Sequence, residues 1–175
     1  MTIKTIFLDR DGIINKEINY LYRIEDCIFI REIFETCQYF QKLGYKIIII
    51  TNQSGISRGY YNEKDFHKLT SWMLEQFTLK GVNILDVFYC PHGPKSICKC
   101  RKPNPGMFLE AKIKHNISMD FSWMIGDNEI DITSANSAGI SNTILVRSAN
   151  ETDKSSSNAK YILESINQAS QVIIS

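Results

Sequence analysis

The sequence lacks both an excess of charge of either sign and a long apolar run. The formal net charge is +1, which argues against a nucleic-acid-binding surface or a basic membrane patch. No apolar run approaches the ~20 residues of a transmembrane helix, and the N-terminus has neither the charged nor the apolar region of a secretory leader. We therefore expect a cytoplasmic protein with no nucleic-acid partner and no membrane partner.

The remaining composition is that of an ordinary globular domain. With 175 residues, of which 43% are hydrophobic and 22% charged, the chain is long enough for one domain with a full core. We expect a single domain over residues 1–175 that acts as a monomer. Because a reducing compartment disfavours disulfides, we expect the five cysteines to be reduced, metal-bound or buried.

Apolar runs and helical stripes alternate along the chain. Strands are predicted at residues 3–8, 45–50, 84–89, 121–125 and 143–146. Helices are predicted at residues 31–43, from Asn62 to Gly81, from Asn104 and Pro105 onward, and up to Ala138, followed by a linker at 155–157 and a closing helix at 161–174. Regular alternation of strands and helices predicts an α/β fold with a doubly wound, mainly parallel sheet.

Two carboxylates, Asp9 and Asp11, follow the first predicted strand, with Gly12 directly after them. Two ionised acids ~4 Å apart repel each other by about 4 kcal/mol at an effective dielectric near 20, so the pattern favours a shared cation or a retained proton. An ordinary Asp-Gly turn is the alternative. A calcium loop is disfavoured because Ile13 and Tyr20 stand where such a loop needs oxygen ligands.

Other strand ends carry complementary chemistry. Thr51 follows the second strand, Asp127 follows the fourth, and Asp131 comes one helical turn later. The basic pair Arg101 and Lys102 lies after the third strand. Carboxylates suit a hard divalent cation, whereas a hydroxyl and an ammonium suit anionic oxygens. Together these residue types indicate a phosphoryl-transfer site.

The loop after the third strand contains Cys90, His92, Cys98 and Cys100. Three thiolates and an imidazole make a complete tetrahedral ligand set for zinc, and such a closed set indicates a structural ion. A disulfide is the weaker interpretation because Cys98 and Cys100 are too close in sequence to bridge easily. A zinc-knuckle module for nucleic acid is disfavoured by the near-neutral charge.

Asp9-Arg10-Asp11-Gly12, Thr51, Lys102 and Asp127 occur in the order of the four motifs of the haloacid dehalogenase (HAD) superfamily of phosphatases, which this chain resembles. The resemblance implies that Asp9 is the nucleophile and Asp11 the general acid and base. It implies that Thr51 and Lys102 hold the transferred phosphoryl group. It also implies a magnesium ion held by Asp9, the backbone carbonyl of Asp11, and Asp127.

The cysteine loop, and the lack of spare length for a cap domain, narrow the resemblance to a small capless HAD subgroup. That subgroup contains the heptose 1,7-bisphosphate 7-phosphatases and the histidinol-phosphate phosphatases, and residues 51–59 and 100–107 look like the heptose enzymes. The resemblance implies a phosphatase acting at the 7-phosphate of a heptose bisphosphate, in nucleotide-activated heptose supply for bacterial surface polysaccharide. Histidinol phosphate is the alternative substrate. The residues that this resemblance places against the sugar phosphate are Glu17, Ile18, Asn19, Tyr20, Asn52, Gln53, Ser54, Arg101 and Asn128.

A phospho-acceptor switch domain is the competing interpretation from outside the enzymes, because it combines a doubly wound sheet with an acidic cluster. Such domains are phosphorylated on an aspartate at the third strand end, and this chain has Cys90 there. The enzyme is therefore the favoured reading of the sequence.

Overall fold

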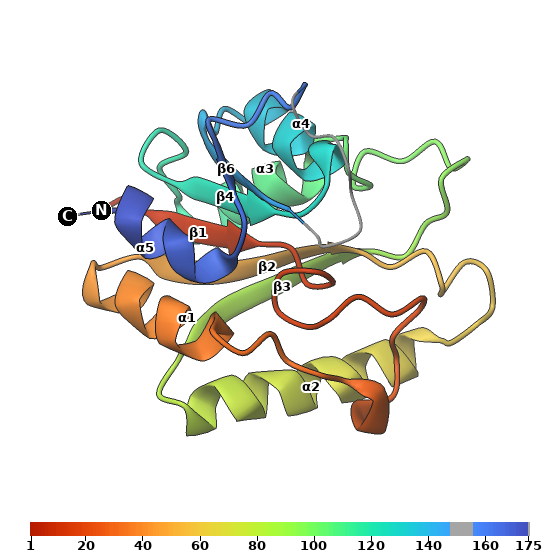
Figure 1. The fold of residues 1–175 in the computed structure, drawn as a ribbon. Coiled ribbons are helices and arrows are strands. Elements are labelled where there is room, and N and C mark those ends of the chain that lie inside the picture. The colour runs from red at the N-terminus through yellow and green to blue at the C-terminus, as the bar shows by residue number, and fades with distance from the viewer. Residues whose placement is uncertain (148–155, 175) are drawn as a thin grey trace.

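The structure, a computed structural model, describes residues 1–147 and 156–174 and contains a six-stranded sheet (Figure 1). The strands are β1 (Thr5–Leu8), β2 (Lys46–Asn52), β3 (Ile84–Cys90), β4 (Trp123–Gly126), β5 (Asn142–Val146) and β6 (Tyr161–Leu163). Their order is β3-β2-β1-β4-β5-β6, and each neighbouring pair runs parallel. The predicted α/β fold with a doubly wound parallel sheet is confirmed.

Helices cover both faces of this sheet (Figure 1). They are α1 (Ile33–Lys42), α2 (Glu63–Leu79), α3 (Gly106–His115), α4 (Glu129–Ser137) and α5 (Ala169–Val172), with short 3-10 helices η1 (Ile24–Asp26) and η2 (Ile166–Gln168). Along β2, Ile47 and Ile49 pack in the core with α1, α2 and α5, whereas Ile48 and Ile50 pack in the core with α3 and α4. Because successive strand side chains point to opposite faces, an unbroken apolar run is what a strand covered on both faces requires.

The chain reverses its direction of travel across the sheet at β1. From β1 the chain builds β2 and β3 on one side, and then crosses over to build β4, β5 and β6 on the other. The register pairs Leu8 with Ile49 on β2 and with Ile125 on β4. The residues that follow these strand ends therefore meet at one edge, at the switch point where α/β sheets commonly bind ligands.

The predicted closing helix at residues 161–174 is wrong. Residues 161–163 form β6, which pairs with β5, and only residues 169–172 form an α-helix. The apolar residues Ile166, Ala169 and Ile173 are spaced as in a helix, and all three are buried in the core. A three-residue strand is too short to show an alternating pattern of its own, so the sequence prediction extended the helix backward over β6. Of the expected linker, residue 155 lies outside the described residues, whereas the Ser157 hydroxyl donates a 2.6 Å hydrogen bond to Glu129.

The third helix begins later than predicted, at Gly106, and Asn104 does not cap it. The amide of Asn104 instead donates to the backbone carbonyl of Cys98, at 2.8 Å. A capping side chain must reach the first free N–H groups of its helix. Asn104 thus connects the start of α3 to the cysteine loop.

Charged side chains lie along the β3 edge of the sheet. The Asp86 carboxylate accepts from His115 Nε2 and Lys114 Nζ, each at 2.7 Å, so α3 is tied to this edge. At the opposite edge, β6 has three residues. Among residues 1–147 and 156–174, no helix is both long and apolar enough to cross a bilayer.

The start of α2 provides a test of the local sequence signals. Asn62 and Asp65 form a capping box, in which each side chain accepts from the backbone N–H of the other, at 2.9 and 3.1 Å. Replacing Asn62 with Ala removes one of these acceptors, and we expect the free energy of unfolding to fall by ~1 kcal/mol. Chemical denaturation would measure the change. Asn83→Ala, at an exposed position before β3, is the matched control, and an equal loss in both variants would contradict the capping role.

Candidate active site

Lys102 lies at the centre of the switch-point edge. Its side chain is 2% exposed, and its Nζ lies 2.9 Å from Asp9 Oδ1 and 2.7 Å from Asp131 Oδ1. The same Nζ donates to the backbone carbonyl of Ile50, at 2.8 Å. A buried ammonium is tolerated only when it is paired and hydrogen-bonded, and here each requirement is met. Residues from β1, β2, the segment before α3, and α4 are thereby joined at one nitrogen.

Asn52 fixes the backbone of Lys102. Its side-chain oxygen accepts from the Lys102 N–H at 3.0 Å, and its amide nitrogen donates to the Lys102 carbonyl at 3.1 Å. These two bonds join the end of β2 to the segment that follows the cysteine loop. The side chain that carries the ammonium is therefore attached to a backbone segment that is held in place by hydrogen bonds.

The electrostatics of the cluster act on Asp9 and Lys102 in different directions. Burial raises the pKa of Asp9 well above its usual value, the charge of Asp131 raises it further, and the ammonium of Lys102 opposes the rise. Burial alone would lower the pKa of Lys102, but the carboxylates of Asp131 and Asp9 raise it above its usual value. Lys102 is thus held as a cation, while the site as a whole carries more negative than positive charge.

That excess negative charge is concentrated in a group suited to a metal ion. Carboxylate oxygens of Asp9, Asp127 and Asp131 all lie within 4.8 Å of one another. Two glycines leave room for this group. A Cβ on Gly12, whose φ is +86°, would lie 2.0 Å from Asp127 Oδ2, and a Cβ on Gly126 would lie 2.4 Å from Asp131 Oδ2. Crowded carboxylate oxygens fit a hard divalent cation such as magnesium.

The side chain of Asp11 lies in a different set of contacts. Both of its oxygens accept from the guanidinium of Arg10, at 3.0 to 3.3 Å. Asn15 Nδ2 donates to Oδ1 at 3.0 Å, and Gln53 Nε2 donates to Oδ2 at 3.2 Å. Gln53 Nε2 also donates to Thr51 Oγ1, at 2.8 Å, so the predicted acid/base and the predicted phosphoryl-binding hydroxyl share one amide.

Most of the residues predicted to bind substrate line one cavity of about 210 Å³ beside Asp11. They are Glu17, Ile18, Asn19, Tyr20, Asn52, Gln53 and Ser54, and Arg10 and Tyr61 complete the wall with Leu21 and Gly55. Burial and the charges of Asp11 and Asp131 raise the pKa of Glu17. The cavity is therefore lined largely by polar side chains and holds the carboxyl groups of Asp11 and Glu17, which could pair with the hydroxyls of a ligand.

Two of the predicted substrate residues lie outside this cavity. Arg101 lines a neighbouring hollow with Lys102, and its Nη1 donates to the His92 carbonyl at 3.1 Å, so the cysteine loop supports the guanidinium. Asn128 caps α4 by accepting from the Ile130 N–H at 3.2 Å. The cap uses the side-chain oxygen of Asn128, which leaves its amide nitrogen as the group for any ligand contact.

The four predicted zinc ligands converge. Cys90 Sγ lies 3.8 Å from Cys98 Sγ, 3.1 Å from Cys100 Sγ and 3.4 Å from His92 Nδ1. Ligands on a tetrahedral ion with Zn–S of ~2.3 Å are separated by about 3.7 Å, so the spacing fits the ion, and the sulfurs are too far apart for a disulfide. Burial raises the pKa of Cys90 to about 12, a penalty that metal coordination removes because zinc binds the thiolate.

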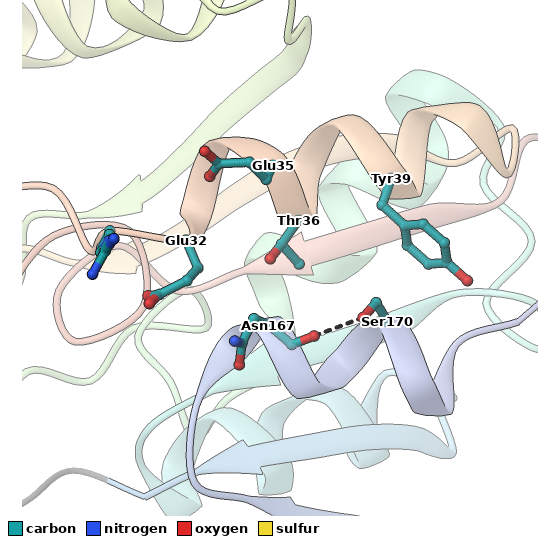
Figure 2. Close-up of a pocket in the computed structure, with 7 residues that line it drawn as sticks. Glu32, Glu35, Thr36, Tyr39, Asn167 and Ser170 are labelled. Carbon is teal, nitrogen blue, oxygen red and sulfur yellow. Dashed lines mark hydrogen bonds between the residues drawn. The ribbon is translucent and has the colours of Figure 1, made fainter.

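Another hollow, of about 300 Å³, lies between α1 and the C-terminal segment (Figure 2). Its lining residues are Arg31, Glu32, Glu35, Thr36, Tyr39, Asn167 and Ser170. Figure 2 shows the side chains of Glu32 and Thr36 extending toward Asn167 and Ser170, where Ser170 donates to the Asn167 carbonyl, whereas Glu35 points away from them. It shares no residue with the acidic cluster.

Comparison with known proteins agrees with this geometry. A family model described as HAD-hydrolase-like matches residues 99–169. A D-glycero-alpha-D-manno-heptose-1,7-bisphosphate 7-phosphatase of Photorhabdus laumondii is 46% identical over 164 residues, covering 90% of each chain. A D-glycero-beta-D-manno-heptose-1,7-bisphosphate 7-phosphatase of Helicobacter pylori is 44% identical, covering 83% of this chain and 84% of that one. The chain belongs to the heptose-1,7-bisphosphate 7-phosphatase family of HAD-like hydrolases.

Solved structures share the fold of this heptose-bisphosphate phosphatase family member. A HAD-like phosphatase from Mesorhizobium loti has a TM-score of 0.84 at 26% identity, covering 98% of this chain and 84% of that one. The D,D-heptose 1,7-bisphosphate phosphatase of B. bronchiseptica, solved with magnesium and phosphate, has a TM-score of 0.85 at 23% identity and covers 97% of each chain. The resemblance to the HAD phosphatases inferred from four short motifs is confirmed.

Several residues of this site were not singled out by the sequence. Arg10, Asn15 and Tyr61 are buried or nearly so around Asp11 and Gln53. Asp131 was noted one turn after Asp127 but received no role, although it is one of the two carboxylates that hold Lys102. The sequence does carry a signal for Asp131, because an acidic residue three positions after Asn128 matches the pattern of a capping box at the start of α4.

The raised pKa of Asp9 predicts a trade-off between function and stability. An acid whose pKa is raised on folding destabilises the fold once the pH exceeds its unfolded value, and the penalty is complete above the folded pKa. We expect metal-free Asp9→Asn to unfold at a higher temperature than the parent near pH 8, with the difference shrinking toward about pH 4. Thermal unfolding in a chelator measures this, with exposed Asp120→Asn as the control. A lower unfolding temperature for Asp9→Asn near pH 8 would contradict the electrostatic argument.

Proposed function

We propose that this protein removes the 7-phosphate of D-glycero-D-manno-heptose 1,7-bisphosphate, in nucleotide-activated heptose supply for bacterial surface polysaccharide. The observation that carries the proposal is the buried ammonium of Lys102, 2.9 Å from Asp9 Oδ1 at the switch-point edge. A fixed cation beside Asp9, the proposed nucleophile, supports the proposal because negative charge develops on the phosphoryl group during its transfer. The family relatives support the heptose, so histidinol phosphate is not favoured.

Within this proposal the reaction divides into two displacements. Asp9 attacks phosphorus while the bond to the sugar oxygen breaks, and Asp11 gives a proton to that leaving oxygen. Asp11 then takes a proton from water as the water attacks the aspartyl phosphate and releases Asp9. Thr51 Oγ1 donates to a phosphoryl oxygen and Lys102 neutralises another, and because both groups are held by other bonds they need little reorganisation.

The proposed magnesium site consists of Asp9, the backbone carbonyl of Asp11, and Asp127. HAD phosphatases use Mg²⁺, and the crowded carboxylates of this chain fit such an ion. When bound, the ion would cancel charge on the phosphoryl group and on the carboxylates. Asp131, which pairs with Lys102, serves mainly to orient the ammonium rather than to bind substrate.

The proposed selectivity comes from the open cavity and from Arg101. In this proposal Glu17, Ile18, Asn19 and Tyr20 face the sugar, together with Asn52, Gln53 and Ser54 of the same cavity. Asn128 lies outside the cavity and is proposed to contact the substrate from the start of α4. Arg101 adjoins Lys102 and offers a planar fork for sugar oxygens or for the second phosphate. The family relatives are named for both the alpha and the beta anomer, so both anomers belong in any assay.

We further propose a structural zinc ion at Cys90, His92, Cys98 and Cys100, a cytoplasmic location and a monomeric state. The thiol set supports the location, because zinc thiolates and free cysteines persist in a reducing compartment. The support for the monomer is the length of the chain, which suffices for a full core without a partner.

The zinc proposal predicts a loss of stability without global unfolding. The large core of the sheet exists apart from the loop, so Cys98→Ser should lower the melting temperature while leaving the secondary structure intact. Elemental analysis of the parent, purified without added metal, should find about one zinc per chain. Cys27→Ser, which lies outside the ligand cluster, is the control and should keep its zinc. A stable parent free of zinc would refute the proposal.

The substrate proposal predicts a ranking of phosphate esters. Histidinol phosphate carries a cationic amine that Arg101 would repel, so kcat/KM should favour the heptose bisphosphate by at least ~100-fold, about 2.7 kcal/mol. Arg101→Ala should shrink this preference while affecting a small generic phosphate ester much less. Phosphate release with Mg²⁺ gives the measurement, both anomers being tested.

Two variants control this assay. Asp9→Asn should lower turnover by ~10³ or more, which shows that the phosphatase measured is this protein. Arg31→Ala, in the hollow of Figure 2, should leave the ranking unchanged. If the parent prefers histidinol phosphate, the substrate assignment is wrong. If the ranking survives in Arg101→Ala, selectivity lies in the cavity beside Asp11.

A further inference from the structure

Arg10 is an arginine buried against a carboxylate that the proposed reaction uses. Its side chain is 3% exposed, and its Nε and Nη2 lie between 3.0 and 3.3 Å from both oxygens of Asp11. A planar fork that meets both oxygens fixes the distance and the plane of the carboxylate together. A lysine could neutralise the same charge but could not fix the plane.

Two buried amides complete the surroundings of Asp11. Asn15 donates to one oxygen and Gln53 to the other, and the side chain of Asp11 remains 23% exposed. The hydroxyl of Tyr61 donates to Gln53 Oε1, which sets the orientation of that amide. Burial raises the pKa of Tyr61 to about 12, so the phenol stays protonated and keeps donating. The exposed part of Asp11 contributes to the wall of the cavity.

Arg10 also connects this carboxylate to the segment that lines the cavity. Its Nη2 donates to the backbone carbonyl of Leu21, at 3.1 Å. The next residue, Tyr22, stacks on Tyr61 with ring centroids 5.4 Å apart and planes 11° apart. One guanidinium therefore sets the position of Asp11 relative to residues 17–21, the wall against which a sugar would lie.

We propose that Arg10 is a positioning residue, which holds the Asp11 carboxyl where it meets the leaving oxygen of a substrate seated in the cavity. This inference rests on the proposed function, because it takes Asp11 as the proton donor. In this role Arg10 acts through its contact with Asp11, although it also lines the cavity. Its contribution is to keep the donor in one orientation, so that proton transfer is aligned when the phosphorus–oxygen bond breaks.

The leaving group separates positioning from a merely structural role. A sugar alkoxide is a poor leaving group and needs its proton as the bond breaks, whereas 4-nitrophenolate leaves without one. Misplacing Asp11 should therefore slow phosphoryl transfer from the heptose bisphosphate far more than transfer from 4-nitrophenyl phosphate. Partial unfolding lowers both rates by the same factor, so the ratio of the two kcat/KM values is independent of the fraction of folded protein.

The experiment compares Arg10→Met, Arg10→Lys and the parent on both esters with Mg²⁺. We expect Arg10→Met to lower kcat/KM for the heptose bisphosphate by ~30- to 100-fold and that for 4-nitrophenyl phosphate by no more than ~3-fold. Arg10→Lys should change the ratio in the same direction, because it keeps the charge but loses the fork. Arg147→Met is the matched control, since Arg147 pairs with Glu164 at 3.0 Å on the surface, and its ratio should equal that of the parent.

Each remaining outcome decides against the inference in a different way. Equal losses on the two esters in Arg10→Met would show that Arg10 acts on a step common to both or only on folding. Full restoration of the ratio by Arg10→Lys would show that charge suffices without the fork. A parent that hydrolyses neither ester would overturn the proposed function itself, which is a distinct result from an active parent whose ratio is unaffected by Arg10.

Discussion

The site depends on one lysine ammonium that has been removed from water. Lys102 is held by Asp9, by Asp131 and by a carbonyl of β2, and Asn52 fixes its backbone. Removing the ammonium of Lys102 would leave the buried carboxylates of Asp9 and Asp131 uncompensated, and a loss of this kind typically costs ~3–5 kcal/mol. The carboxylates therefore depend on the ammonium before any substrate arrives, and their pairing with it brings four segments of the chain to one point.

The same cluster contains more carboxylates than cations. The carboxylates of Asp9, Asp127 and Asp131 crowd together against one ammonium, and burial, together with the charges of Asp131 and Asp127, raises the pKa of Asp9. A carboxylate that is costly to ionise in the empty fold becomes favourable to ionise once a divalent cation shares the site. The proposed cation site and the proposed nucleophilic role of Asp9 therefore depend on the same electrostatic arrangement.

The sequence predicted the parts of this arrangement that follow from regular structure. Apolar runs located the central strands, and parallel strands bring their carboxyl ends to one edge, so Asp9, Thr51 and Asp127 were expected to meet. The cysteine spacing predicted a ligand cluster, and the four side chains do converge. Each of these features follows either from the periodicity of strands and helices or from a short spacing along the sequence.

The remaining features depend on contacts that no period encodes. The three residues of β6 form a strand because β5 offers an edge at that position, and their own pattern does not show it. No pattern in the sequence assigns a role to Arg10, and only the fold places it between Asp11 and Leu21. Asn52 and Gln53 were expected to touch the substrate. In the structure the side chain of Asn52 hydrogen-bonds to the backbone of Lys102, and that of Gln53 hydrogen-bonds to Thr51.

The two margins of the sheet have a consequence for how the molecule behaves in a crowded solution. A long unpaired strand offers its free N–H and C=O groups to any neighbouring chain, which is a common route to aggregation. Here the carboxylate of Asp86 on β3 is held by Lys114 and His115, and the opposite margin ends in the short β6. Charge at one margin and brevity at the other both discourage the addition of a foreign strand, so the fold protects its own solubility without a covering domain.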